Sequence, residues 1–414
     1  MRRRLVAGIA ALCAVASVLL VAQPAAADSI RDREYWLADY GITQAWKTTR
    51  GAGVTVAVID TGIDASHPDL TGTVVGGTDI SGVGRSDGRQ PVGDDSQHGT
   101  MVASLLAGHG HGDQAGVIGV APDARLLSVS VGFGVGTVSS DDQIAEAVRW
   151  SVDNGADVIN MSLTRNTLEW PQSWDDAFLY AMEHDVVVVA AAGNRGSGTT
   201  EVGAPATMPG VLTVAGVDRS GAASFDASSQ GITISVAAPS EELVGAAPGG
   251  GYYSWAGTSG ATPIVAGLVA LIRSAYPDLD ANNVINRIIR TASPVGSTVP
   301  SPIYGYGLID AARSVTAKVD PVTSNPMGDL REWIRLHRRA AITPTPTPTA
   351  SSAPVPVPVQ PPESKPENPL GTLLPTVAML RDVGIPLLVY TGFGVLLVLV
   401  ARQGYRRVKG TRRR

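Results

Sequence analysis

The stretch Val54–Gly62 reads VTVAVIDTG and decides the fold class of this chain of 414 residues. Six apolar or β-branched residues precede Asp60, with no alternation of polar side chains. Such a run is typical of a parallel strand that is covered on both faces. Ligand sites of open parallel sheets lie just beyond the carboxyl ends of their strands. The stretch therefore predicts a parallel sheet with Asp60 at its functional edge.

Strand and helix patterns alternate after this stretch. Similar apolar runs occupy residues 126–131, 158–162, 186–192 and 211–217, and helical patterns occupy 141–154, 174–183 and 262–275. In the first helix, Ile144, Ala147 and Val148 recur at helical spacing behind Ser139 or Ser140, either of which can cap it. The alternation predicts an α/β domain with a mainly parallel sheet.

The amino-terminal segment 1–27 has the plan of a secretory signal peptide. Three arginines precede an apolar run over residues 5–21, and Pro-Ala-Ala-Ala at 24–27 supplies the small residues of a cleavage site. An uncleaved anchor is the alternative, and either would export the following domain. The only cysteine, Cys13, lies in the apolar run, so the mature chain is expected to lack disulfides and a cysteine nucleophile.

The carboxyl-terminal part predicts a membrane anchor. A proline-rich linker over 343–369 and a juxtamembrane stretch over 370–383 precede 18 uncharged residues at 384–401. This length suffices for a transmembrane helix, and the linker argues against the alternative of a buried core helix. The tail 402–414 carries seven Lys or Arg, which predicts a cytoplasmic carboxyl terminus and an extracytoplasmic domain at the cell membrane.

Charge excludes some functions. The net charge is −5 although both ends are basic, so the exported domain is acidic and nucleic-acid binding is not expected.

Segment 318–342 connects the domain to the linker, and its basic cluster of Arg331, Arg335, Arg338 and Arg339 is interpreted as a solvated face. Neither Asp94-Asp95 nor Asp141-Asp142 has the spacing of a calcium site, so no metal or cofactor is predicted.

Three segments carry residues suited to nucleophilic catalysis. Asp60-Thr61-Gly62 ends a strand, where a carboxylate can orient an imidazole, although the same triplet also resembles an aspartic-protease signature without its second copy. His98 starts an apolar helical pattern after a polar loop, whereas His67 suits a structural role better. Ser259 lies between Thr258 and Gly260 and is by default a helix cap.

Asn194 is a fourth candidate, because it follows a buried strand. Its amide can donate to an oxyanion, or it can simply form a turn after Gly193. Together the four segments resemble the subtilisin family of serine proteases, and the order Asp, His, Ser is the subtilisin order. The resemblance runs from about Tyr40 to Ala317 and includes residues 60–64, 67–70, 119–122 and 160–163.

The resemblance implies a subtilisin-like three-layer α/β fold, with a mainly parallel sheet, in a protease domain over 28–317. Residues 28–50 would form an amino-terminal extension, and the transmembrane helix would follow the domain. By the resemblance, Ser259 is the nucleophile, His98 the general base and Asp60 the group that orients it.

The resemblance also implies roles around this triad. Asn194 and the backbone N–H of Ser259 would form the oxyanion hole. Ser162, Leu163 and Thr164 would border an extended protein or peptide substrate. Family members commonly have glycine at the position of Thr164, so we expect a narrower cleft and a restricted substrate range.

The whole chain plan resembles the mycosins, membrane-anchored proteases associated with type VII secretion in actinobacteria. The short segment before Asp60 leaves little room for an inhibitory propeptide, although mycosins often contain disulfides that this chain lacks. The resemblance implies an extracytoplasmic serine endopeptidase that works through an acyl-enzyme beside a type VII secretion membrane complex. The alternatives are a structural subunit of a secretion complex with secondary proteolytic activity, and a broad degradative protease.

Overall fold

Seven strands form the central sheet of the computed structural model, which describes residues 30–112, 114–198 and 200–338. Their spatial order is β2-β5-β1-β6-β7-β8-β9, and every neighbouring pair is parallel. The bounds are β1 Thr55–Asp60, β2 Val74–Asp79, β5 Arg125–Ser130, β6 Val158–Met161, β7 Val187–Ala191, β8 Leu212–Val217 and β9 Ile234–Pro239. Every residue of β1 is buried, as the apolar run predicted.

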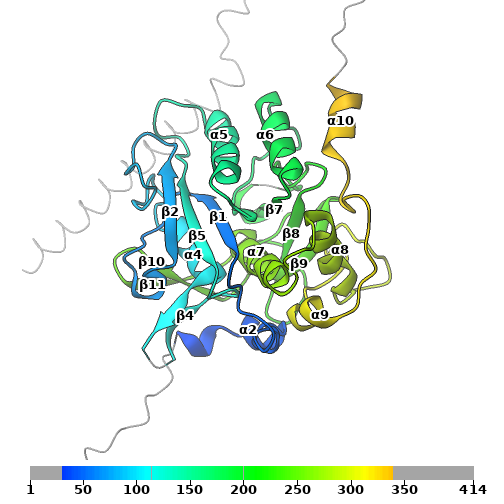
Figure 1. The fold of residues 1–414 in the computed structure, drawn as a ribbon, viewed down its shortest axis with the longest axis horizontal. Coiled ribbons are helices and arrows are strands. Elements are labelled where there is room, and N and C mark those ends of the chain that lie inside the picture. Colours follow the sequence, from blue (N-terminus) through cyan, green and yellow to red (C-terminus); the bar gives the residue numbers. More distant parts are fainter. Residues whose placement is uncertain (1–29, 113, 199, 339–414) are drawn as a thin grey trace, which may run out of the picture. The chain divides into compact units, whose positions relative to one another are not determined.

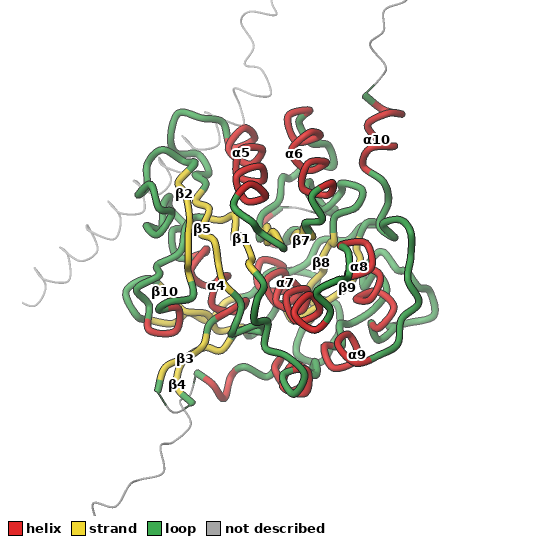
Figure 2. The backbone as a smooth tube through the Cα atoms, in the orientation of Figure 1, coloured by secondary structure: helices red, strands yellow, loops and turns green. Residues whose placement is uncertain are grey.

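Helices cover both faces of this sheet (Figures 1 and 2). In the view of Figure 1, α5 and α6 lie above the strands, α7 lies lower in the middle of the view, and α8 lies to the right of β9, while α4 packs against α7. The main helices are α4 His98–Ala107, α5 Ser140–Asp153, α6 Gln172–Glu183, α7 Thr258–Ala275, α8 Ala281–Thr291, α9 Ala311–Thr316 and α10 Leu330–His337. These three layers confirm the predicted α/β fold class.

The start of α7 differs from the sequence prediction. We predicted a helix over 262–275, but the helix begins at Thr258 and includes both Ser259 and Pro263. Proline has no N–H, so Pro263 cannot bond to the carbonyl four residues earlier, which is that of Ser259. The extra turn is stabilised instead by side chains that surround Ser259, described below.

Two hairpins flank the sheet. One pairs β3 His109–His111 with β4 Ala115–Ile118, and the other pairs β10 Leu243–Ala247 with β11 Gly251–Trp255. The backbone N–H of Ala246 in β10 donates to Ser104 Oγ in α4 at 2.9 Å. This bond fixes the second hairpin against the helix that His98 begins, and the chain then runs directly from β11 into α7.

Residues before β1 and residues after β9 also belong to the packed domain. In the amino-terminal extension, the helices α2 Trp36–Asp39 and α3 Ile42–Ala45 bury Trp36 and Ile42 completely. At the other end, Trp333 of α10 packs against Trp170 with ring centroids 4.3 Å apart. The basic cluster is partly paired, because Arg338 Nε lies 2.7 Å from Asp175 Oδ2.

Several predictions lie outside the described residues. These are the signal peptide 1–27, the linker 343–369, the juxtamembrane stretch 370–383, the transmembrane helix 384–401 and the tail 402–414. Within the described residues, only α7 has the length and hydropathy of a membrane span, and 83% of it is buried inside the domain. We therefore interpret α7 as a core helix.

Candidate active site

Asp60 and His98 form a close pair at the carboxyl end of β1. The Nδ1 atom of His98 lies 2.8 Å from Asp60 Oδ1 and 3.0 Å from Oδ2. The backbone N–H of Thr61 donates to Asp60 Oδ1 at 2.8 Å, and Thr61 Oγ1 accepts from the N–H of Gly99 at 3.0 Å. A side chain at Gly99 would collide with the carbonyl of Gly62, so glycine allows α4 to approach β1 this closely.

Ser259 lies in the first turn of α7 and is joined to Ser162 by two hydrogen bonds. The hydroxyl of Ser259 donates to the carbonyl of Ser162 at 3.1 Å. In return, the hydroxyl of Ser162 donates to the Ser259 carbonyl at 2.8 Å, which is the acceptor that Pro263 cannot use. Asn160 Nδ2 in turn donates to Ser162 Oγ at 3.1 Å. The position of Ser259 is therefore fixed relative to the end of β6.

Asn194 lies beside Ser259, and its amide is oriented by Thr258. Both the backbone N–H and the hydroxyl of Thr258 donate to Asn194 Oδ1, at 2.8 and 2.9 Å. With Oδ1 used in this way, Nδ2 remains as the donor end of the amide. Gly257 has a φ of 140°, and a Cβ there would lie 2.9 Å from Nδ2. Glycine before Thr258 thus keeps space around this donor.

All seven site residues predicted from the sequence line one cavity of about 240 Å³. The structure therefore brings together Asp60, His98, Ser162, Leu163, Thr164, Asn194 and Ser259. Ser162, Leu163 and Thr164 follow β6, which ends at Met161, and border the cavity as a short segment outside the strand. Thr164 Oγ1 donates to the carbonyl of Arg165 at 3.0 Å. Its side chain occupies space that a glycine would leave open.

Trp255 is a site residue that our sequence analysis missed. Its ring lies edge-on to His98 with centroids 5.7 Å apart. It also lines a second cavity of about 600 Å³, which includes His98, Asn194 and Ser259 and continues along β11. Its closeness to Ser259 in the sequence was a signal, since residues just before a candidate nucleophile commonly border the same site.

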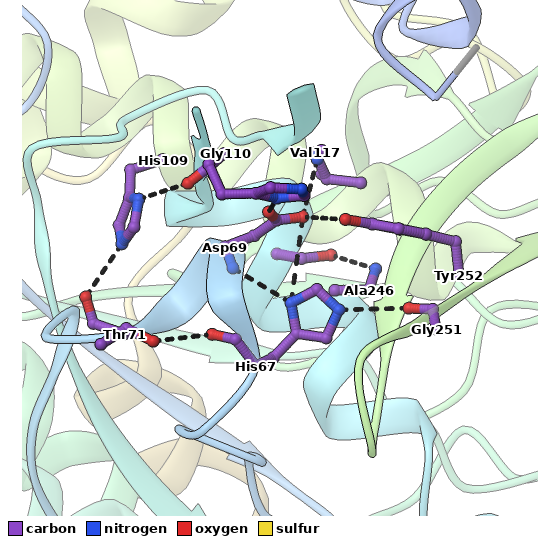
Figure 3. Close-up of polar contacts among 12 residues, drawn as sticks. His67, Asp69, Thr71, His109, Gly110, Val117, Ala246, Gly251 and Tyr252 are labelled. Atoms are coloured by element: carbon purple, nitrogen blue, oxygen red, sulfur yellow. Dashed lines mark hydrogen bonds and ion pairs between the residues drawn. The ribbon is translucent and has the colours of Figure 1, made fainter. Parts of the chain in front are cut away.

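A buried polar network holds the hairpin that carries Trp255 (Figure 3). Asp69 is fully buried, and its Oδ2 accepts from the Tyr252 hydroxyl at 3.0 Å and from the N–H of Val117 at 2.8 Å. His67 is also buried, and its Nε2 lies 3.2 Å from the carbonyl of Gly251. His67 therefore has the structural position that the sequence suggested, at a distance from the catalytic candidates.

The environment of His98 favours its charged form. Burial lowers the pKa of His98, but the Asp60 carboxylate outweighs burial through its charge and its hydrogen bond, and the pKa rises above its ordinary 6.5. Asp95 raises this pKa further through its charge. The side chain of His98 is still 19% exposed, so it can exchange protons at the cavity surface. No group of three or more His, Cys, Asp or Glu in the described part of the chain could hold a metal ion.

We expect peptide hydrolysis to be lost on acidification with a midpoint above pH 6.5. Only neutral His98 can accept a proton from a serine, and a raised pKa means that His98 becomes protonated at a higher pH than a free histidine. Activity is therefore retained above the raised pKa and lost below it. Initial rates on one peptide from about pH 5 to about pH 10 measure the midpoint. A flat profile, or a midpoint below 6.5, would contradict the role of His98 as base.

Comparison with known proteins agrees with this geometry. Residues 51–307 match the model of the subtilase family. The chain is 40% identical to Subtilisin DY of Bacillus licheniformis over 268 residues, which cover 63% of this chain and 90% of that protein. MycP1 from Mycobacterium smegmatis superposes with a TM-score of 0.61 at 30% identity, over 74% of this chain and 89% of that one. The MycP3 protease from the type VII (ESX-3) secretion system superposes with a TM-score of 0.59 at 32% identity, over 72% and 90%.

Proposed function

Because the chain belongs to the subtilase family and is a serine endopeptidase with structural similarity to mycosins, we propose that Asp60, His98 and Ser259 are its catalytic triad. Family membership confirms the enzyme class predicted from the sequence. The observation that carries the residue assignment is the Asp60–His98 pair, at 2.8 Å, in the same cavity as Ser259 and Asn194.

In the proposed reaction, Ser259 attacks the carbonyl carbon of a peptide bond. Its hydroxyl first turns from the Ser162 carbonyl towards His98, which takes the proton on Nε2 while Asp60 holds Nδ1–H. The oxyanion is stabilised by Asn194 Nδ2 and by the N–H of Ser259, since N–H groups in the first turn of a helix have no partner within the helix.

Collapse of this intermediate leaves an acyl group on Ser259. His98 gives its proton to the departing amine, and a water molecule then attacks the ester with His98 again acting as base. Ser162, Leu163 and Thr164 are placed to pair with the backbone of an extended substrate beside the nucleophile. Thr164 lines this cavity at a position where family members commonly have glycine, which supports a restricted set of substrates.

We place this activity outside the cell membrane, on a domain held by the predicted helix 384–401. The support is the order of signal peptide, domain, proline-rich linker, apolar stretch and basic tail in the sequence. The similarity to the MycP1 and MycP3 proteases supports a further proposal, that the enzyme works beside a type VII secretion complex on a few exported proteins.

A cellular comparison tests this function. The natural gene would be replaced by a Ser259→Ala allele or by a Ser297→Ala control, which changes an exposed serine outside both cavities. Proteomics of protein amino termini in the exported fraction is expected to lose a few termini in Ser259→Ala only. Loss of very many termini would favour a broad degradative protease. Unchanged termini, together with normal secretion that fails only when the whole gene is deleted, would favour a structural subunit.

A further inference from the structure

The two cavities meet at four residues. The 240 Å³ cavity and the 600 Å³ cavity are both lined by His98, Asn194, Ser259 and Asp95. The proposed mechanism uses the first three in bond cleavage. Asp95 has no part in bond cleavage, yet it lines both cavities together with the nucleophile. A substrate residue in either cavity would therefore share its lining with this carboxylate.

The charge of Asp95 is not cancelled by neighbouring cations. The lining of the two cavities contains no Lys or Arg, and its only other carboxylate, Asp60, is 2% exposed and paired with His98. Asp95 is exposed, and its Oδ1 accepts from the side-chain amide of Gln97, which is neutral. No ion pair joins Asp95 to a Lys or Arg of the described residues within 4.0 Å. The cleft is therefore negative beside the scissile bond.

The backbone holds Asp95 in a defined place relative to the proposed base. Its carbonyl accepts from the N–H of His98 at 3.0 Å, which closes the turn that leads into α4. The residue after Asp95 is also held, because the hydroxyl of Thr61 lies 3.4 Å from the carbonyl of Ser96. The charge of Asp95 already acts on the His98 ring, whose pKa it raises. A cation of a substrate in either cavity would lie in the same field.

We propose that Asp95 is a specificity-determining residue that favours substrates with an Arg or Lys beside the scissile bond. This inference rests on the proposed protease function. Because Asp95 is exposed, water and salt screen the interaction, and we expect a preference of about two- to fivefold in kcat/KM. A larger effect would need a buried pair, which the exposure of Asp95 does not provide.

The test uses peptides that differ only in charge. Each peptide carries one arginine, or its neutral isostere citrulline, at one of the four positions that flank the scissile bond. Rates are measured on the alkaline plateau of the pH profile, at a pH where arginine is still charged. Wild type is expected to favour arginine by about two- to fivefold at one or more positions, and by less at about 0.5 M salt.

Two matched variants identify the source of the preference. Asp95→Asn is expected to remove this preference, measured within each enzyme as the ratio of kcat/KM on the arginine peptide to kcat/KM on its citrulline partner, so that a change common to both peptides cancels. Asp94→Asn removes the same charge one residue away, at an exposed position that lines neither cavity, and should keep the preference. Equal rates on arginine and citrulline in wild type would overturn the inference, as would a preference that survives in Asp95→Asn or disappears equally in Asp94→Asn.

Failure of the proposed function would look different. In that case wild type would cleave none of the peptides, and Ser259 would not react with a serine-directed phosphonate, so the inference would fall together with the triad. A wild type that cleaves the citrulline peptides and ignores charge would refute only the role of Asp95.

Discussion

Ser259→Ala is expected to lower kcat for peptide hydrolysis by about 10⁶-fold, the size of the loss known for removal of the nucleophile from subtilisin. Alanine leaves no atom that could attack the peptide carbonyl or carry the acyl group. A residual rate above that in water is expected, since the Asn194 amide and the substrate-binding segment remain. The measurement is the steady-state rate on a peptide that the wild type cleaves, with a sensitive fluorescent readout.

Loss of structure must be separated from loss of the nucleophile. The Ser259 side chain makes one hydrogen bond, to the carbonyl of Ser162, and is only partly buried. Its removal should change the unfolding midpoint by no more than about 2–4 °C, because such a bond contributes about 1 kcal/mol. The exposed-site control Ser297→Ala should keep full activity. If folded Ser259→Ala hydrolysed the peptide at the wild-type rate, another residue would be the nucleophile.

Asp60→Asn is expected to lower kcat by about 10⁴-fold while the fold is kept. The N–H of Thr61 donates to Asp60 Oδ1, so the asparagine oxygen should take that position. The amide nitrogen would then replace Oδ2, 3.0 Å from His98 Nδ1, where it can donate to Nδ1 but cannot accept from it, and only the neutral oxygen at the Oδ1 position, 2.8 Å away, would remain as an acceptor. The neutral amide would therefore no longer hold the proton of His98 on Nδ1 or stabilise the charged imidazole, and His98 with its proton on Nε2 cannot accept the Ser259 proton.

The same variant also has a predicted effect on pH dependence. Attraction to Asp60 is the main cause that raises the pKa of His98 against burial, so its loss should shift the remaining acid limb to lower pH. Asp94→Asn provides the control, because it removes one exposed carboxylate outside both cavities. Full activity in Asp60→Asn, or equal losses in the two variants, would exclude the proposed orienting role.

The sequence predicted the interior of the sheet better than its edges. Strands such as β1 and β7 are buried on both faces and leave continuous apolar runs, and their bounds agree with the prediction within one or two residues. The edge strand β2 was missed because it contains Gly76-Gly77 and is only partly buried, so it has little hydrophobic signal. Strand order could not be read from the sequence, since it depends on contacts between distant segments.

The candidate site was predicted from sequence motifs, whereas the strands were predicted from hydrophobic runs. Asp60, His98, Ser259 and Asn194 were found through motifs that resemble a known family, and the structure brings them to one cavity. The two reciprocal hydrogen bonds between Ser162 and Ser259 were not predicted. Pro263 was a signal for them, because a proline in a helix leaves the carbonyl four residues earlier without its helical partner.

Residues without a motif could not be placed in the site. Trp255 reaches His98 only because the Tyr252–Asp69 bond and the pairing of β11 with β10 hold its hairpin over α4. In the sequence, Asp95 was considered as a calcium ligand, and Asp94-Asp95 does not have the spacing of a calcium site. Its position between two cavities follows from the tertiary structure alone. The anchor and signal peptide remain sequence predictions.

Covalent labelling tests the central claim most directly. The wild-type enzyme would be treated with a fluorophosphonate, which forms a stable adduct with an activated serine, and the modified residue would be identified by peptide mass spectrometry. We predict a single adduct on Ser259 that forms rapidly in wild type, much more slowly in Asp60→Asn, and not at all in Ser259→Ala. An adduct on another serine, or an unmodified Ser259 in enzyme that is hydrolysing peptides, would contradict the proposed triad.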